Sequence, residues 1–245
     1  MFLKIFTFFL LGFLGSVECA NVGLLVMATG KYIRFIPPLV ESAETHFCRN
    51  HKVTYFVFTD QEPIPLPNTV YIFQSRLGWP LDTMARYHVY EKNWDLFKDQ
   101  DFLFASDADM LFVAEVGDEI LGERVATLHP GFVGKRERDL PYEANPNSKA
   151  CVKTHERKSY FAGGFYGGAR EAFHHILQTN IAHIDDDLSK EIVAVWHDES
   201  HWNRYCLDYP PTVILNPSYC YPESWSLPYP RKLLALDKNH AEVRK

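Results

Sequence analysis

Apolar runs and helical periodicities alternate along the first half of the chain. Short runs rich in β-branched and aromatic residues predict strands, and longer stretches with apolar residues three or four positions apart predict helices. The predicted strands are residues 22–27, 52–59, 69–73 and 102–106, and the predicted helices are residues 32–47 and 82–97. This alternation is typical of an α/β protein with a mostly parallel sheet.

The second half has a less regular pattern, which predicts fewer long elements. The predicted strands are 125–129 and 212–215, the predicted helices are 169–180 and 188–194, and 160–168 (YFAGGFYGG) is a strand pair or a strand followed by a turn. The polar tail, residues 237–245, is expected to fray unless a bound diphosphate orders it. No linker is evident, so we expect one domain with a nucleotide-facing half and a substrate-shaping half.

The N-terminus has the pattern of a secretory leader. Lys4 precedes an almost wholly apolar run, residues 5–17, and small residues follow at alternate positions. The run is shorter than the about 20 residues that a membrane span needs. We therefore expect residues 1–20 to be a signal peptide or, alternatively, a short signal anchor that associates with the membrane. Residues 21–245 would then form the working domain, in the Golgi lumen or membrane or secreted.

Composition excludes one class of partner and leaves the thiols open. The 245 residues carry a net charge of -6 with acids and bases interspersed, so nothing indicates a nucleic-acid surface. Of the five cysteines, Cys206 and Cys220 are the pair that would bridge in an oxidising compartment, and buried free thiols are the alternative.

An acidic pair follows the most apolar strand. Asp107-Ala108-Asp109 comes directly after residues 102–106 (FLFAS). Side chains two residues apart in extended chain point the same way, and the carboxyl ends of strands are where α/β sheets bind ligands. Both carboxylates can therefore bind one hard divalent cation that carries a phosphorylated ligand. The alternative is a solvated loop after a strand.

A second cluster, Trp196-His197-Asp198-Glu199-Ser200-His201-Trp202, holds four ionisable residues between two tryptophans. Aromatic side chains suit sugar rings, and glycosyl chemistry needs a carboxylate near the anomeric carbon, for which Glu199 is the candidate. The alternative is a helix N-terminus capped by Asp198 or Ser200. Gly163 and Gly164 indicate either close approach of a ligand or simple packing.

These motifs occur in one order that resembles glycosyltransferase family 6, which includes the histo-blood-group A and B transferases and the α-1,3-galactosyltransferase. The resemblance covers residues 22–245. Its marks are residues 41–47 (ESAETHF), 55–60 (YFVFTD), 107–109 (DAD), 129–132 (HPGF), 165–168 (FYGG), 194–201 (AVWHDESH) and 238–240 (KNH).

The resemblance implies a single GT-A domain, a UDP-sugar donor, Mn²⁺ and transfer of Gal or GalNAc to a galactoside 3-hydroxyl with retention. It assigns the metal to Asp107 and Asp109 and the catalytic carboxylate to Glu199. The implied nucleotide contacts are Met27, Ala28, Thr29, Tyr32, Arg86, Asp107, Ala108, Asp109, Lys238 and Arg244. The implied donor-sugar contacts are Ala162, Gly163, Gly164, His197 and Asp198, and the implied acceptor contacts are His129, Trp196 and Glu199.

Two details of the resemblance bear on substrates. Donor choice in the family depends on positions matching Ala162 and Gly164, where small residues leave room for an acetamido group and favour GalNAc. An acceptor-contacting aspartate of the vertebrate enzymes falls at Pro222, so the acceptor, a galactoside that is fucosylated in some members, stays open. The long stem of those enzymes is missing, which allows a secreted or microbial form. A UDP-sugar hydrolase and a non-catalytic, lectin-like sugar-binding module on the same fold are the alternatives.

Overall fold

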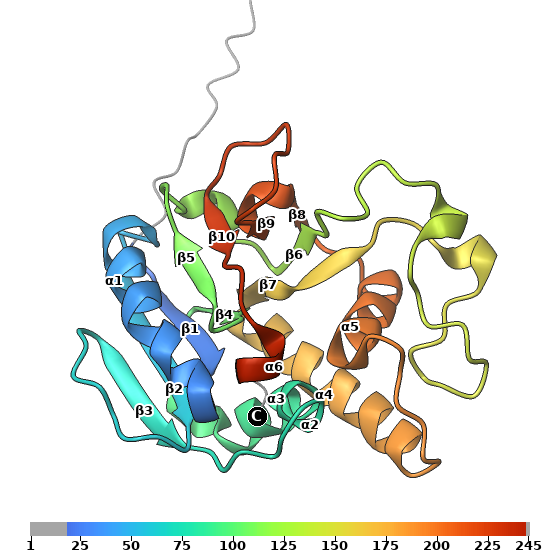
Figure 1. Ribbon diagram of the computed structural model, residues 1–245, viewed down its shortest axis with the longest axis horizontal. Helices are drawn as coiled ribbons and strands as arrows, with labels where there is room; N and C mark the ends of the chain where they lie inside the picture. The colour runs from blue at the N-terminus through green and yellow to red at the C-terminus, as the bar shows by residue number, and fades with distance from the viewer. Residues whose placement is uncertain (1–18, 244–245) are drawn as a thin grey trace, which may run out of the picture.

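The computed structural model describes residues 19–243, which form an α/β fold around a seven-stranded sheet (Figure 1). The strand order is β3-β2-β1-β4-β7-β6-β8, and only β7 runs antiparallel to its neighbours. The strands are β1 (Asn21–Met27), β2 (Lys52–Thr59), β3 (Thr69–Phe73), β4 (Phe102–Ser106), β6 (Arg124–Leu128), β7 (Phe161–Ala169) and β8 (Val213–Leu215). The expected mixed α/β architecture with a mostly parallel sheet is confirmed.

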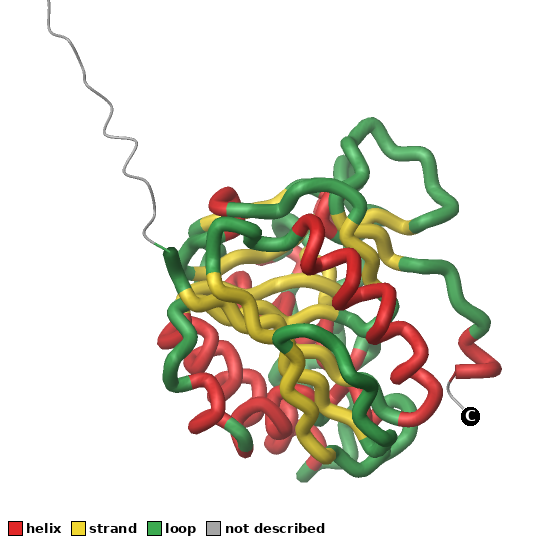
Figure 2. Tube along the Cα trace, turned by 90° about the vertical axis from the view of Figure 1, so that its left-hand side faces the viewer, coloured by secondary structure: helices red, strands yellow, loops and turns green. Residues whose placement is uncertain are grey.

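Helices cover both faces of this sheet (Figure 2). Leu24 of β1 packs in a core with α1 (Ile36–His46), whereas its neighbour Leu25 packs in the core of the opposite face. That second core includes α3 (Arg86–Lys92), α4 (Arg170–Leu188) and α5 (His197–Asp208). Successive strand residues point to opposite faces, so a strand buried on both sides is apolar at every position.

A small sheet of order β5-β10-β9 brings the C-terminal segment to the end of β4. Its strands are β5 (Met110–Phe112), β9 (Tyr221–Pro222) and β10 (Leu233–Ala235). After β10 the Leu236 N–H donates to the Asp109 carbonyl (2.8 Å), and the chain ends in α6 (His240–Val243). The short elements are α2 (Leu81–Met84) and the 3₁₀ turns η1 (Gly30–Phe35), η2 (Trp94–Phe97), η3 (Asp118–Ile120), η4 (Glu137–Asp139), η5 (Thr154–Glu156) and η6 (Pro217–Tyr219).

Several predicted elements are wrong in extent. The helix predicted at 188–194 does not form, because α4 continues to Leu188 and the chain then turns through Glu191, which has a φ of 58°. The segment 160–168 is one continuous strand, not a pair. The helix predicted at 32–47 is divided into η1 and α1, and the one at 82–97 is divided into α2, α3 and η2.

The predicted leader lies almost wholly outside the described residues, which begin at Cys19, and Arg244 lies beyond their end. Cys206 and Cys220 are free thiols. Within residues 19–243, no helix is both long and apolar enough to cross a membrane.

Candidate active site

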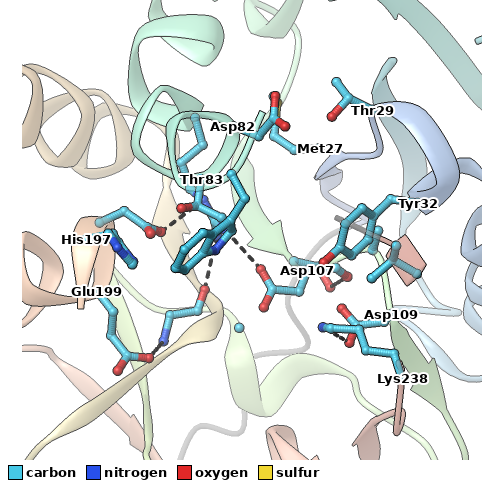
Figure 3. A pocket seen from close by; sticks show the side chains of 18 of the residues that line it. Met27, Thr29, Tyr32, Asp82, Thr83, Asp107, Asp109, His197, Glu199 and Lys238 are labelled. Carbon is cyan, nitrogen blue, oxygen red and sulfur yellow. Dashed lines mark hydrogen bonds and ion pairs between the residues drawn. The ribbon is translucent and has the colours of Figure 1, made fainter. Parts of the chain in front are cut away.

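A cavity of about 620 Å³ lies where β1, β4 and the first turn of α5 meet (Figure 3). Most of the residues that the family resemblance assigns to substrates line it. They are Met27, Thr29, Tyr32, Arg86, Asp107, Ala108, Asp109, Gly163, Gly164, Trp196, His197, Asp198, Glu199 and Lys238. Three other assigned residues, Ala28, Ala162 and His129, do not line this cavity.

Arg86 connects three parts of the site. Its guanidinium is buried and reaches Asp107 Oδ1 (3.0 Å), Asp198 Oδ2 (3.1 Å) and the carbonyl of Gly163 (3.2 Å). Burial alone would lower the pKa of Arg86, but the charges of Asp198 and Asp107 raise it well above its usual value. A permanent cation therefore fixes the orientation of two carboxylates and one strand of the cavity wall.

Asp107 and Asp109 crowd two carboxylates at the end of β4. Burial, followed by the charge of Asp107, raises the pKa of Asp109. Lys238 from the C-terminal segment forms an ion pair with Asp109 Oδ2, and its ammonium lies 5.6 Å from the centre of the Tyr32 ring. The carboxylate pair thus requires positive charge, which Lys238 supplies to one member and Arg86 to the other.

The acidic pair fits a hard divalent cation that is shared with a ligand. Carboxylate oxygens are the donors that such cations prefer. No group of three or more His, Cys, Asp or Glu side chains suited to a metal ion occurs within residues 19–243. Two carboxylates alone leave most of the coordination sphere to other oxygens, which a bound diphosphate would provide.

The C-terminal segment closes one side of the cavity. Val243 of α6 is buried and lines it, and Glu242 pairs with Arg34 of η1 (2.5 Å). The part of the predicted frayed tail that the structure describes is therefore packed against the cavity and η1.

Glu199 lies in the first turn of α5, where its Oε2 accepts the N–H of Gly163 (2.8 Å). Burial raises its pKa from 4.5 to about 7, and the Gly163 N–H offsets only part of this rise. Its neighbour His197 has a φ of 52°, a conformation that costs free energy outside glycine and is concentrated at functional sites. The ring of His197 lies 4.9 Å from that of Trp79.

The raised pKa of Glu199 predicts a pH-dependent gain in stability for Glu199→Gln. The pKa of Glu199 is higher in the folded protein than in the unfolded chain. Its protonated form therefore contributes to the free energy of unfolding at low pH, and this contribution is lost as pH rises through about 7. At pH 8 the variant, which keeps an oxygen for the Gly163 N–H, should unfold with a free energy up to about 3 kcal/mol higher. Thermal unfolding at pH 8 and pH 4.5 measures this difference. An equal shift in Tm at both values would contradict the buried-charge explanation.

His129 does not line the main cavity, but it lies against Tyr160, on which the charge of Glu199 acts. Burial lowers the pKa of His129 to about 4, so its imidazole is neutral, and its Nδ1 accepts the N–H of Gly131 (3.1 Å). Its ring is 5.9 Å from Tyr160, whose pKa is raised by burial and then by the charge of Glu199.

Sequence reasoning assigned no role to seven of the residues that line this cavity, which are Arg76, Trp79, Asp82, Thr83, Ser106, Val195 and Val243. Arg76 and Trp79 line the cavity from the segment before α2, and Cys220 lies next to the side of Gly164 on which a side chain would project. A Cβ added to Gly164 would lie 3.1 Å from the Cys220 sulfur and 3.5 Å from Asp107 Oδ2. Trp79 lies in a Gly-Trp-Pro sequence, which is a turn signal, and its side chain is half exposed.

An α/β sheet that brings paired carboxylates, Lys238 of the C-terminal segment and a largely enclosed glutamate into one cavity fits a glycosyltransferase. The chain belongs to glycosyltransferase family 6, whose model matches residues 16–245, and the resemblance drawn from its motifs is confirmed. It is a hexosyltransferase.

Curated relatives come from animals and a bacterium. The chain is 35% identical to histo-blood group ABO system transferase 1 of Rattus norvegicus over 94% of this chain and 70% of the relative. It is 31% identical to globoside alpha-1,3-N-acetylgalactosaminyltransferase 1 of Gallus gallus over 91% and 69% of the two chains. The O-antigen biosynthesis glycosyltransferase WbnI of Escherichia coli is 27% identical over 89% of this chain and 94% of its own.

Proposed function

We propose that this protein is a single GT-A domain that transfers GalNAc, in preference to Gal, from a UDP-sugar to the 3-hydroxyl of a galactoside. The proposal includes Mn²⁺ dependence and retention at the anomeric carbon. One observation carries it: a single cavity is lined by the Asp107–Asp109 pair at one end of the donor path and by Glu199 at the other. That arrangement matches a UDP-sugar donor, because its diphosphate needs a bound cation and its anomeric carbon needs a nearby negative charge in the transition state.

The nucleotide half of the site binds and neutralises the leaving group. Mn²⁺ held by Asp107 and Asp109 would supply Lewis-acid charge to the diphosphate oxygens. Lys238 is already beside Asp109, so a short movement of its ammonium would pair it with a phosphate. Met27, Thr29 and Tyr32, which line the β1 end of the cavity, suit the uridine.

The sugar half of the site stabilises positive charge at the anomeric centre. The bond from Gly163 N–H fixes the orientation of the Glu199 carboxylate. In the proposed complex this carboxylate faces the oxocarbenium-like carbon. Retention then proceeds either through a covalent intermediate on Glu199 or by front-face attack of the acceptor. In both routes the ionised form of Glu199 is the active one, and closure of the C-terminal segment keeps water from the donor.

The space at Gly164 favours GalNAc, and it predicts a donor switch. Gly164→Ala would place a methyl group against the Cys220 sulfur and Asp107, in the region assigned to the C2 substituent of the donor. We expect transfer from UDP-GalNAc to fall about 10-fold relative to transfer from UDP-Gal. Competing the two donors in one reaction measures the ratio.

The matched control is Gly117→Ala, whose Cβ would meet only Glu119 Oε2 at 3.5 Å, and Gly117 does not line the cavity. An unchanged donor ratio in Gly164→Ala would remove position 164 from donor selection.

The remaining roles follow the family assignment. In the proposed site Arg86 contacts the nucleotide, His197 and Asp198 contact the donor sugar, and Trp196 and His129 contact the acceptor. We expect the enzyme to work in the secretory pathway, Golgi-resident or secreted, or as an exported or membrane-associated enzyme of a microbe.

The test is the stereochemistry of the product. The full chain is incubated with Mn²⁺, UDP-GalNAc and a fucosylated galactoside, and the product is analysed by proton NMR. The proposal predicts a new α-linked GalNAc on the galactose 3-oxygen. A β-linked product, or free GalNAc alone as a hydrolase would form, would contradict it. Binding without turnover would favour the lectin-like alternative.

A further inference from the structure

The segment between β9 and β10 is a long loop at the top of the view in Figure 1. Just before its start, Cys220 lies beside Gly164 of the cavity wall, where a Cβ on Gly164 would be 3.1 Å from its sulfur. At its end, the Asp237 N–H donates to Glu223 Oε2 (2.9 Å), directly before Lys238. The segment, residues 223–232, is therefore anchored at both ends next to residues that line the cavity.

The segment carries a half-exposed tryptophan, Trp225, whose side is packed against the turn after β6. A Cβ on Gly131 would lie 3.6 Å from Trp225 Cη2 and 3.3 Å from His129 Cε1. Trp225 and His129 thus flank the same glycine, with 45% of Trp225 open to solvent. A larger residue at position 131 would push the two rings apart.

Trp225 is held in place by its own loop. Its N–H donates to the carbonyl of Pro222 (3.1 Å), and its carbonyl accepts from Arg231 Nη2 (3.0 Å). Arg231 also lies 5.1 Å from the ring centre of the buried Tyr221, whose hydroxyl accepts the Leu227 N–H (2.6 Å). The indole is therefore exposed on a loop whose conformation is fixed by hydrogen bonds. Binding residues are often found on such loops, which a rigid scaffold holds in place.

A short series of contacts connects Trp225 with the reacting end of the site. Trp225 and His129 share Gly131, His129 lies against Tyr160, and the charge of Glu199 acts on Tyr160. The imidazole of His129 is neutral, so it adds no charge beside Trp225.

We propose that Trp225 is a stacking platform for the acceptor, and that it takes the pyranose ring next to the galactose that receives the donor sugar. An indole offers a large, rigid apolar face at low conformational cost, and the C–H face of a pyranose covers it. This inference rests on the proposed function, and it names the acceptor as a glycan of at least two sugars. Trp225 binds but takes no part in bond making.

The experiment compares two acceptors, a methyl galactoside and a fucosylated galactoside, in Trp225→Ala and Trp225→Phe. For the disaccharide we expect Trp225→Ala to raise KM about 10-fold with kcat unchanged, and Trp225→Phe to retain most of the affinity. For the monosaccharide, and for UDP release without acceptor, we expect no change. Phe73→Ala is the control, since Phe73 is 78% exposed on the edge strand β3.

Saturation-transfer NMR with the same two glycans reports binding without turnover, so it separates this inference from the proposed reaction. Loss of the disaccharide signal in Trp225→Ala supports the platform even if the wild-type protein transfers no sugar. An unchanged KM and signal for the disaccharide would overturn it. Equal losses for both acceptors, with a lowered Tm, would also overturn it and leave Trp225 a packing residue.

Discussion

Replacing Glu199 with glutamine is expected to lower kcat for sugar transfer about 10³-fold while UDP binding stays unchanged. The amide keeps the size of the side chain and an oxygen for the Gly163 N–H, so the geometry of the site is preserved. In the proposed mechanism it removes the negative charge that stabilises the developing positive charge of the anomeric carbon. Single-turnover transfer and calorimetric titration with UDP measure the two quantities separately.

The control for this variant is Glu119→Gln, because Glu119 pairs with Lys232 and Tyr219 outside the cavity. It should transfer at the wild-type rate. Near-normal transfer by Glu199→Gln would remove Glu199 from the mechanism, whereas loss of UDP binding would show that the substitution disturbs the nucleotide end.

Replacing Asp109 with asparagine is expected to weaken Mn²⁺-dependent UDP binding at least about 100-fold. The change removes one of two carboxylates that face the diphosphate region and leaves the ammonium of Lys238 without its anionic partner. Titration of UDP with and without Mn²⁺ separates the metal-dependent part of the affinity from the rest. This readout does not require turnover.

Two further variants test whether the effect is specific to the acidic pair. Asp107→Asn should have a similar effect, because Asp107 is the other member of the pair. Asp118→Asn is the control, since Asp118 pairs with His51 at 2.8 Å and does not line the cavity. An Asp109→Asn protein that retains its metal-dependent affinity would mean that the acidic pair binds no metal.

Local patterns made much of the site predictable. Asp107 and Asp109 follow a strand that is buried on both faces, so its apolar run identifies both the strand and the point where it ends. Glu199 is part of a dense motif whose residues are close in sequence, and the first turn of one helix presents them together.

What was missed depends on contacts between distant segments. Asp187 stands in an acidic run, residues 185–187, that has the pattern of a solvated surface. It is nevertheless buried in the last turn of α4, where it accepts the N–H of Lys149 (2.7 Å) and the hydroxyl of Ser148 (2.5 Å). Trp225 and Cys220 acquire their neighbours only because the C-terminal segment returns to β5 and β7. The hydrophobic pattern of one segment cannot predict which distant segment it will contact.

The most direct test of the central claim is release of UDP by the full chain with Mn²⁺, from UDP-GalNAc and from UDP-Gal, with and without a fucosylated galactoside. The account predicts release that the acceptor stimulates, with UDP-GalNAc as the better donor. Release that the acceptor does not change would contradict the transferase assignment and indicate a hydrolase. No release from a protein that still binds UDP would indicate a sugar-binding module.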